Sequence, residues 1–342
     1  MSSIRGMVGI DVSKKELTYA LGDARTHQIR WERAVPRTVA GVKKLLSQTP
    51  PEVPWVIEPT GRYSLMVAKL ALEAGQEVLM APPRKAKAFL ASLPQRAKND
   101  RLDGRGLALF GLTRAVSRPL MPYPVKSEKV EQLDQLLSAR KGISQALSRL
   151  KQQQRELPYA AGALGEAVAD LEKRLVALDE RIAEQTKAQD GFPVAKELDA
   201  VHGIGGITAA AVAARLDAKG FGHPDQFVAY IGLDLVVCDS GEKKGKHRLS
   251  KQGDAELRRL LYLCAAASLR AKGSPFAAQY ERELAKGLPR TAALCIVARK
   301  MAKLCWSLHH HRSTYDPRRV YQQAPAQPRP DATPAAEAAS AD

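Results

Sequence analysis

The feature that most restricts the fold of this chain is a long series of large, mostly apolar residues spaced three and four positions apart. The series covers residues 133–157 and resumes over residues 164–182. Spacing of this kind, sustained over several heptads, is typical of a coiled-coil seam, and Pro158 and Gly162 divide it in two. We therefore expect an antiparallel helical hairpin over residues 123–190, serving as an oligomerisation arm or as part of a plain helical bundle.

Two polar residues, Arg140 and Gln154, interrupt this seam. A polar residue at a seam position stabilises little but favours one register of the two helices. We expect both to set the register of the hairpin.

Before the hairpin, the pattern alternates between strands and helices. Strands are predicted over residues 7–11, 16–21, 27–35, 54–58 and 76–80, and helices over residues 39–48, 62–74, 84–93 and 101–117. Three strands followed by helix, strand, helix, strand and helix is the order of a ribonuclease-H-like α/β fold, in which helices cover a sheet with parallel later strands. Residues 1–122 are expected to form this domain.

After the hairpin, residues 191–316 have the pattern of a compact, mostly helical domain. The segment 198–216 reads as a helix end, a glycine-rich turn and an alanine-rich helix, which is the form of a helix-hairpin-helix. Gly203 and Gly205 allow the tight turn, and the free N–H groups of the next helix can face a phosphate. The alternative is a glycine turn between two packed helices. The tail 317–342, rich in Pro, Ala and Gln, is expected to be disordered.

The charge of the chain favours a polyanionic partner. Lys and Arg number 53 and Asp and Glu 36, for a net charge of +17, and such a balance is most often found in nucleic-acid-binding proteins. Residues 1–122 carry +10, residues 123–190 are neutral and residues 191–316 carry +7. No apolar run is long enough to span a membrane, no secretory signal begins the chain, and four scattered cysteines fit reduced thiols in the cytoplasm.

Four carboxylates of the first domain form a candidate metal site. Asp11 and Glu58 each end a predicted strand, while Asp100 and Asp103 lie three apart on one face at the start of a predicted helix. Converging carboxylates require cations between them, and two magnesium ions in such a site assist phosphoryl transfer. A turn residue or a helix cap is the alternative for each. The basic neighbours suit a phosphate backbone or, equally, a solvated helix surface; they are Lys98, Arg101 and Arg105.

A serine in the last domain is a candidate nucleophile. Ser240 precedes Gly241 in a flexible, cationic loop that can approach a phosphodiester, although Ser-Gly is also common in ordinary turns, and Ser250 competes as a helix-preceding cap. Basic residues follow Ser240 and lie on a helix beginning near Asp254. They are candidate phosphate ligands: Lys243, Lys244, Lys246, Arg248, Lys251, Arg258 and Arg259.

Several segments together resemble the insertion-sequence 110 transposases. The first three are VGIDVSK around Asp11, VIEPTG around Glu58 and KNDRLDGRGLALF around Asp100 and Asp103. Two later ones, LDAVHGIGGITAAAVAARL and YIGLD…DSG…RLSKQGDAELRRLL, resemble the second domain of that family. The match runs in order from about residue 8 to about residue 315.

This resemblance implies a bacterial DNA recombinase with a RuvC-like first domain. It implies that Asp11, Glu58, Asp100 and Asp103 hold magnesium and that Ser240 forms a covalent 5′-phosphoserine link to DNA. It further implies a structured bridge RNA that pairs with donor and target DNA, and a dimer that assembles into a tetramer with composite active sites. Such a protein acts in the cytoplasm, on the nucleoid when bound to DNA.

The chain departs from the family pattern at Asn99 and Gly104, where Thr and Ala are common, and LDLVVCDSG lacks a frequent Pro-Arg. Two other functions remain open on the residues alone. One is a metal-dependent junction nuclease in which water attacks, and the other is a non-catalytic nucleic-acid-binding scaffold.

Overall fold

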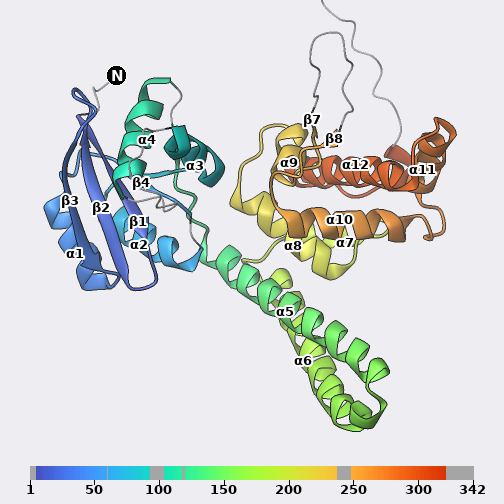
Figure 1. Ribbon diagram of the computed structural model, residues 1–342. Helices are drawn as coiled ribbons and strands as arrows, with labels where there is room; N and C mark the ends of the chain where they lie inside the picture. Colours follow the sequence, from blue (N-terminus) through green and yellow to red (C-terminus); the bar gives the residue numbers. More distant parts are fainter. Residues whose placement is uncertain (1–4, 60, 93–103, 118–119, 237–247, 321–342) are drawn as a thin grey trace, which may run out of the picture. The chain divides into compact units, whose positions relative to one another are not determined.

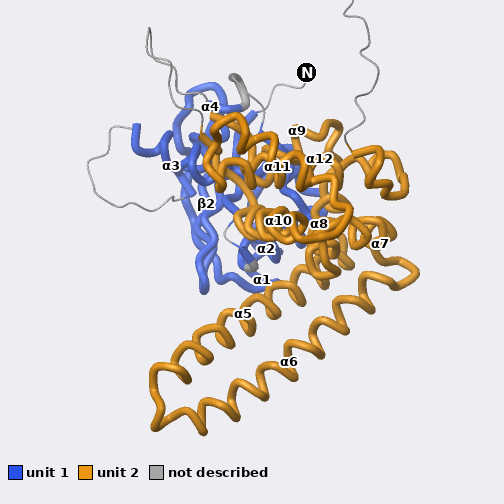
Figure 2. The backbone as a smooth tube through the Cα atoms, turned by 90° about the vertical axis from the view of Figure 1, so that its right-hand side faces the viewer, with its two compact units in different colours: residues 1–125 blue, residues 126–342 orange. Residues whose placement is uncertain are grey.

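The structure of this chain is a computed structural model that describes residues 5–59, 61–92, 104–117, 120–236 and 248–320 (Figure 1). The chain divides into two compact units, residues 1–125 and residues 126–342 (Figure 2). Within the described residues, no helix combines the length and the apolar character that crossing a bilayer requires.

Unit 1 is built on one mixed sheet with the strand order β3-β2-β1-β4-β5-β6. The strands are β1 (Gly6–Val12), β2 (Glu16–Asp23), β3 (Ile29–Pro36), β4 (Trp55–Ile57), β5 (Val78–Met80) and β6 (Met121–Pro122). The first three pair antiparallel, and β4 and β5 run parallel to β1. An α/β first unit is therefore confirmed. The short edge strand β6 was not predicted, because two residues ending in proline carry no strand pattern.

Helices cover both faces of this sheet. They are α1 (Val39–Gln48), α2 (Arg62–Glu73), α3 (Pro83–Ser92) and α4 (Gly104–Ser117). Leu45 on α1 and Val67 on α2 share a core with Ile10 on the sheet, whereas Phe110 on α4 shares a second core with Met7 and its neighbours on the opposite face. The sheet therefore has α1 and α2 on one side and α3 and α4 on the other.

Strand β3 begins two residues later than predicted, because residues 23–28 form a tight turn. The carboxylate of Asp23 accepts hydrogen bonds from the N–H groups of Arg25 at 2.7 Å and Thr26 at 3.1 Å. These bonds and the side chain of Arg30 lower the pKa of Asp23 to about 2. His27 completes the turn with a positive φ of 53°.

Unit 2 begins with a long helical hairpin made of α5 (Glu128–Glu156), the 3₁₀ turn η1 (Pro158–Ala160) and α6 (Ala161–Lys187), which pack side by side (Figure 1). The predicted break at Gly162 is wrong, since Gly162 lies inside α6 and the reversal occurs at Pro158. Both seam interruptions have partners: Arg140 Nη2 is 3.0 Å from Asp179 Oδ2, and Gln154 donates to the Ala161 carbonyl at 3.2 Å.

The remainder of unit 2 is a mostly helical bundle. Its elements are α7 (Val194–Asp199), α8 (Gly206–Ala218), α9 (Pro224–Tyr230), β7 (Leu235–Val236), β8 (Arg248–Leu249), α10 (Ala255–Ser268), α11 (Pro275–Ala285), α12 (Arg290–His311) and the 3₁₀ turn η2 (Pro317–Arg319). Val130, Leu133 and Ile182 at the base of the hairpin belong to the same core as these helices. The base of the hairpin is thus fixed to the bundle.

Candidate active site and nucleic-acid-binding elements

Asp11 and Glu58 occupy equivalent positions on two neighbouring parallel strands. β1 pairs with β4 in a register that sets Ile10 beside Ile57, so the next residue along each strand direction is one of the two acids. Neighbouring strands lie roughly 4.8 Å apart. The register therefore brings the two carboxylates to one point at the carboxyl end of the sheet, where sites are commonly built in α/β folds.

Both acids belong to the face of the sheet that α4 covers. Side chains alternate between the two faces along a strand. Met7, four residues before Asp11, and Val56, two before Glu58, lie in the core that contains Phe110 of α4. The alternation assigns Asp11 and Glu58 to this same face.

The carboxyl group of Glu58 has an altered acidity. Partial burial raises its pKa, and the negative charge of Asp11 raises it further. Both effects penalise the ionised form. A cation between the two carboxylates would remove this penalty, and hard oxygen donors of this kind are the ligands that magnesium prefers.

Two glycines allow α4 to approach β1 beside the acids. A Cβ atom on Gly9 would lie 2.1 Å from the Ala108 nitrogen and 2.2 Å from the Gly104 carbonyl oxygen. A Cβ atom on Gly104 would lie 2.8 Å from the Thr18 carbonyl oxygen. The start of α4 therefore rests directly on the sheet, two residues before Asp11 on β1.

Of the other residues predicted for this site, the structure describes one, Arg105. Asp100, Asp103, Lys98 and Arg101 lie outside the described residues. Arg105 is on the exposed surface of α4, where its Nη1 atom is 3.8 Å from Glu32 Oε2. Among the described residues no group of three or more His, Cys, Asp or Glu side chains has metal-binding geometry.

Arg37 is a residue of this region that the sequence analysis did not single out. Its Nε donates to the Lys14 carbonyl at 2.9 Å, in the loop after Asp11. Its guanidinium also lies 4.3 Å from the ring centre of Tyr63, at the start of α2. Arg37 therefore links the two segments that follow the acids, and no local motif marks it.

In unit 2, the glycine-rich turn lies between α7 and α8. Gly203 has φ of 90°, and a Cβ atom there would lie 2.4 Å from the Cys264 carbonyl oxygen, so glycine is required for both conformation and space. Gly205 is the N-cap of α8 and has open space around it. His202 Nδ1 is 2.9 Å from the hydroxyl of Tyr315, which places the end of the described chain beside the turn.

The segment that carries Ser240 lies outside the described residues, as do Lys243, Lys244 and Lys246. Its two ends are described: β7 and β8 pair antiparallel, with Val236 opposite Arg248. Ser250 donates to the carboxylate of Asp234, and its N–H bonds the Asp234 carbonyl at 2.9 Å. Asp254, not Ser250, caps α10 by accepting from the Leu257 N–H at 2.9 Å.

The basic residues around this ribbon differ in how they are held. Arg248 and Lys251 are exposed. Arg258 donates to the Ile231 carbonyl at 2.8 Å, and Arg259 pairs with Glu256 at 2.6 Å. The two helix-borne arginines thus have partners inside unit 2 as well as being candidates for phosphate contacts.

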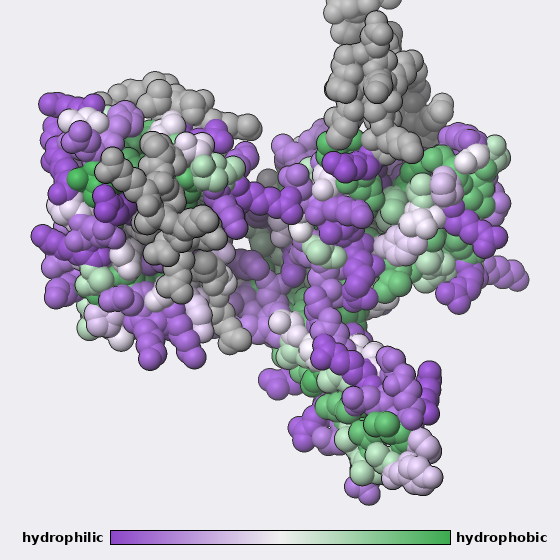
Figure 3. Space-filling model, in the orientation of Figure 1, coloured by the Kyte–Doolittle hydropathy of each residue, from purple (hydrophilic) through white to green (hydrophobic). Residues whose placement is uncertain are grey.

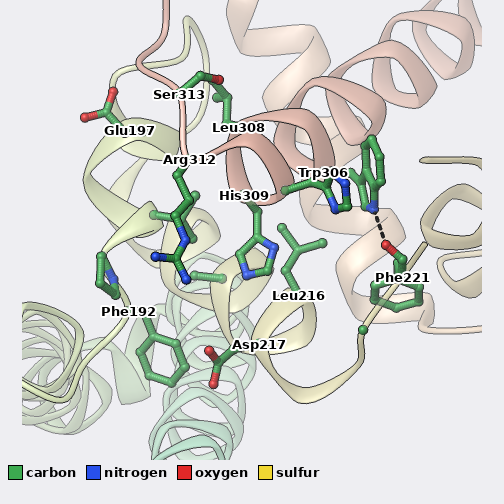
Figure 4. A pocket seen from close by; sticks show the side chains of 15 residues that line it. Phe192, Glu197, Leu216, Asp217, Phe221, Trp306, Leu308, His309, Arg312 and Ser313 are labelled. Carbon is green, nitrogen blue, oxygen red and sulfur yellow. Dashed lines mark hydrogen bonds between the residues drawn. The ribbon is translucent and has the colours of Figure 1, made fainter. Parts of the chain in front are cut away.

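A cavity of about 510 Å³ lies between α7, α8 and the end of α12 (Figure 4). His309 and Arg312 point into it, near Asp217. Burial lowers the pKa of His309, an effect that Asp217 opposes. His310 also lines the cavity and stacks on Trp306, with ring centres 4.5 Å apart.

Two family models match the chain. One is described as a transposase, of the DEDD type of IS110, and matches residues 8–157. The other is described as the transposase IS116/IS110/IS902 family and matches residues 195–281.

Curated relatives match over long stretches. A "Probable family 20 transposase" of Pseudomonas aeruginosa is 27% identical and covers 91% of this chain and 98% of its own. An uncharacterized 44.8 kDa protein of insertion element IS116 from Streptomyces clavuligerus is 22% identical and covers 78% of this chain and 84% of its own. A 42 kDa protein of IS900 from Mycobacterium paratuberculosis is 27% identical over 44% of this chain.

Proposed function

This chain belongs to the IS110 family of transposases, and from that premise we propose that it cuts and exchanges DNA strands with a four-acid metal site and a serine nucleophile. The observation that carries the proposal is the parallel register that brings Asp11 and Glu58 together at one end of the sheet. Two partly buried carboxylates of like charge penalise each other's ionised form, and a cation between them would remove this penalty.

A ribonuclease-H-like, specifically RuvC-like, unit 1 is supported by its topology. The order β3-β2-β1-β4-β5, with three antiparallel strands and then parallel ones, is the order expected for that fold. The close approach of Gly104 to β1 supports bringing Asp103, its direct neighbour in the chain, toward Asp11. We therefore assign Asp11, Glu58, Asp100 and Asp103 as ligands of magnesium.

Magnesium, when bound, supplies charge stabilisation at a phosphate oxygen. The chain itself supplies the four carboxylates that would hold the metal and the hydroxyl oxygen of Ser240, which is the nucleophile. In the proposed step the Ser240 oxygen forms a bond to phosphorus as the bond to the 3′ oxygen breaks. The serine loses its proton and the 3′ oxygen gains one. In the second step another 3′ hydroxyl forms a bond to phosphorus as the bond to the Ser240 oxygen breaks. The hydroxyl loses its proton and the serine regains one, so that a DNA phosphodiester is restored.

Other parts of unit 2 have proposed roles in nucleic-acid binding. The turn at Gly203 and Gly205 acts as a helix-hairpin-helix that contacts a phosphate. Arg248 on β8 and Lys251 just after it contact phosphates as well. A structured bridge RNA guides the choice of donor and target DNA. This last element rests on family membership alone.

The hairpin of α5 and α6 is proposed as a coiled-coil arm that joins protomers into a dimer and then a tetramer. Its surface exposes large apolar side chains, at the tip and along α6: Leu157, Tyr159 and Val176. Figure 3 shows hydrophobic side chains gathered near the end of the hairpin on the face drawn. The hairpin segment also carries no net charge, which suits contact between identical chains.

The proposal is tested by trapping protein on DNA. The full chain, its RNA and labelled donor DNA are incubated with magnesium, denatured and separated by size. A covalent protein–DNA species is expected with the native chain and with Ser250→Ala, which removes a hydroxyl bonded within the fold. It is expected to disappear with Ser240→Ala and with EDTA.

The other outcomes decide between functions. Cut DNA ends without any covalent species would indicate a nuclease in which water attacks. If Asp11→Asn and Glu58→Gln change neither the DNA products nor the covalent species in this assay, the chain is a non-catalytic scaffold. Loss of RNA binding in Asp11→Asn would indicate that this acid has a folding role.

A further inference from the structure

The positive charge of the last domain is concentrated in its final two long helices. Residues 270–303 contain eight basic and two acidic side chains. Residues 191–269, which include the basic run after Ser240, contain ten basic and nine acidic side chains. Nearly all of the net charge of the domain therefore belongs to α11, α12 and the loop before them.

Two buried side chains of α11 hold part of this charge in place. Gln279 and Glu283 are 5% and 6% exposed. The Gln279 amide oxygen accepts from Lys300 of α12 and from Arg282, both at 3.0 Å. Both oxygens of Glu283 lie 3.2 Å from Lys286 Nζ. Buried acceptors thus fix the amine and guanidinium groups of two adjacent helices at the surface.

A second carboxylate anchors the middle of α12. Asp225, at the start of α9, lies 2.7 Å from Lys303 Nζ and 3.9 Å from Arg299 Nη2. We name the resulting set the α11–α12 basic cluster. Its members are Arg282, Lys286, Arg299, Lys300 and Lys303. In the described part of the chain three of these cations, Lys286, Arg299 and Lys303, are ion-paired to the carboxylates of Glu283 and Asp225, and the other two bond the Gln279 amide oxygen.

The cations of this cluster repel one another. Partial burial lowers the pKa of Lys300, and the charges of Arg282, Lys286 and Lys303 lower it further, while Glu283 acts in the opposite direction. A row of external anions would offset this repulsion. The two helices lie side by side (Figure 1), so that such a row would meet donors from both.

We propose that the α11–α12 basic cluster binds the sugar-phosphate backbone of DNA without reading its sequence. Rigid helices present point charges and an arginine fork, which are the groups that bind backbone phosphates. The choice of DNA rests on the proposed function, in which DNA is the substrate. None of its five members belongs to β7, β8 or the glycine turn.

The test measures binding of the full chain to a random-sequence DNA duplex by fluorescence anisotropy across a sodium chloride series. The test variant is the triple change Arg299→Gln, Lys300→Gln and Lys303→Gln. Each lost phosphate contact reduces the salt slope by about 0.9. The slope is expected to become shallower by about 2–3, and the affinity at 100 mM salt to fall by about tenfold or more.

Two control proteins separate this effect from general charge and from misfolding. The triple change Lys151→Gln, Lys173→Gln and Lys187→Gln removes the same charge from the α5–α6 hairpin and is expected to leave the slope nearly unchanged. The double change Lys300→Arg and Lys303→Arg keeps the charge and is expected to bind as the native chain does. Equal losses in both glutamine triples, or a native slope in the α12 triple, would overturn the proposal.

An RNA duplex of the same length serves as the second arm. A shallower salt slope of the α12 triple variant on the DNA duplex supports the proposal, whether or not the slope on RNA also changes. A shallower slope on the RNA duplex alone overturns the choice of DNA. Binding in this assay does not depend on Ser240 or on magnesium. If the proposal for the cluster is wrong, the covalent adduct can still form. If the proposed chemistry is wrong, the salt slope can still be measured.

Discussion

At the scale of single residues, the approach of α4 to the sheet depends on the absence of one carbon atom. Gly9 leaves space for the backbone of Gly104 and Ala108. A glycine within a strand normally weakens it, and its presence marks a place where another backbone comes close. Here that place lies two residues from a proposed metal ligand.

Gly9→Ala is expected to destabilise unit 1 by about 3 kcal/mol or more, because the new methyl group meets backbone atoms that cannot yield easily. The thermal midpoint of that unit should fall by about 10 °C or more, measured by circular dichroism. Gly142→Ala is the matched control. It adds the same carbon in open space on α5 and is expected to be neutral or slightly stabilising. Equal effects would contradict the close approach.

Arg37 is expected to be a positioning residue for the two acids. Arg37→Ala removes the link between the loop after Asp11 and the start of α2. We expect the magnesium concentration for half-maximal DNA cleavage to rise by about tenfold, as is common when groups that orient metal ligands are lost. Arg37→Lys keeps a donor near Lys14 and should restore part of the loss. An unchanged magnesium requirement in Arg37→Ala would exclude this role.

At the scale of elements, an ion-paired glutamate joins the hairpin to the bundle. Glu256 on α10 lies 2.6 Å from Arg259 and 2.8 Å from Lys141 on α5. The hydrogen bond to Arg259 and the bond to Lys141 lower its pKa from 4.5 to about 2. A lowered pKa in the folded state means that the ionised carboxylate stabilises the fold above pH 4.5, and that this contribution is lost as the pH falls toward 2.

Glu256→Gln is therefore expected to reduce the free energy of unfolding by about 1–2 kcal/mol at pH 7, a value discounted for partial exposure. The deficit relative to the native chain should shrink below pH 4.5 and vanish near pH 2. Urea denaturation at several pH values measures it. Glu166→Gln removes the same charge from an exposed position on α6 and should show no comparable deficit. A deficit that does not change with pH would refute the assignment.

At the scale of the whole molecule, the chain has separate hydrophobic cores in its two units. Leu45 is fully buried in a core of residues from unit 1, and Leu198 is fully buried in a core of residues from unit 2. Each unit can therefore bury enough apolar surface to fold as a cooperative body. The base of the hairpin packs into the core of unit 2, so we expect the hairpin to unfold with that unit.

Calorimetry of the full chain is expected to resolve two unfolding transitions. Leu45→Ala should lower one midpoint and Leu198→Ala the other, each by an amount that corresponds to about 2–5 kcal/mol. The two variants make the same chemical change in different cores, so each is the control for the other. A single transition shifted by both variants would show that the units unfold together.

The sequence by itself determined most elements of the first unit, their order, and the hairpin that follows. Alternation in the first 122 residues predicted five of the six strands, and the spacing of apolar residues predicted α1 with the bounds Val39–Gln48 and the two helices of the hairpin. It also identified Asp11 and Glu58 as acids at strand ends. These features are local, because the periodicity of a strand or a helix depends on residues that are close along the chain.

Only the tertiary structure decided which of these residues meet. The register of β1 with β4, the contact of Gly9 with Gly104, and the link through Arg37 join segments that are distant in sequence, and no local period encodes such pairs. Within the last domain, the sequence places most of the net positive charge on α11, α12 and the loop before them, and the structure shows that buried side chains of α11 hold part of it at the surface. Packing between elements, not the pattern within one, determined the site.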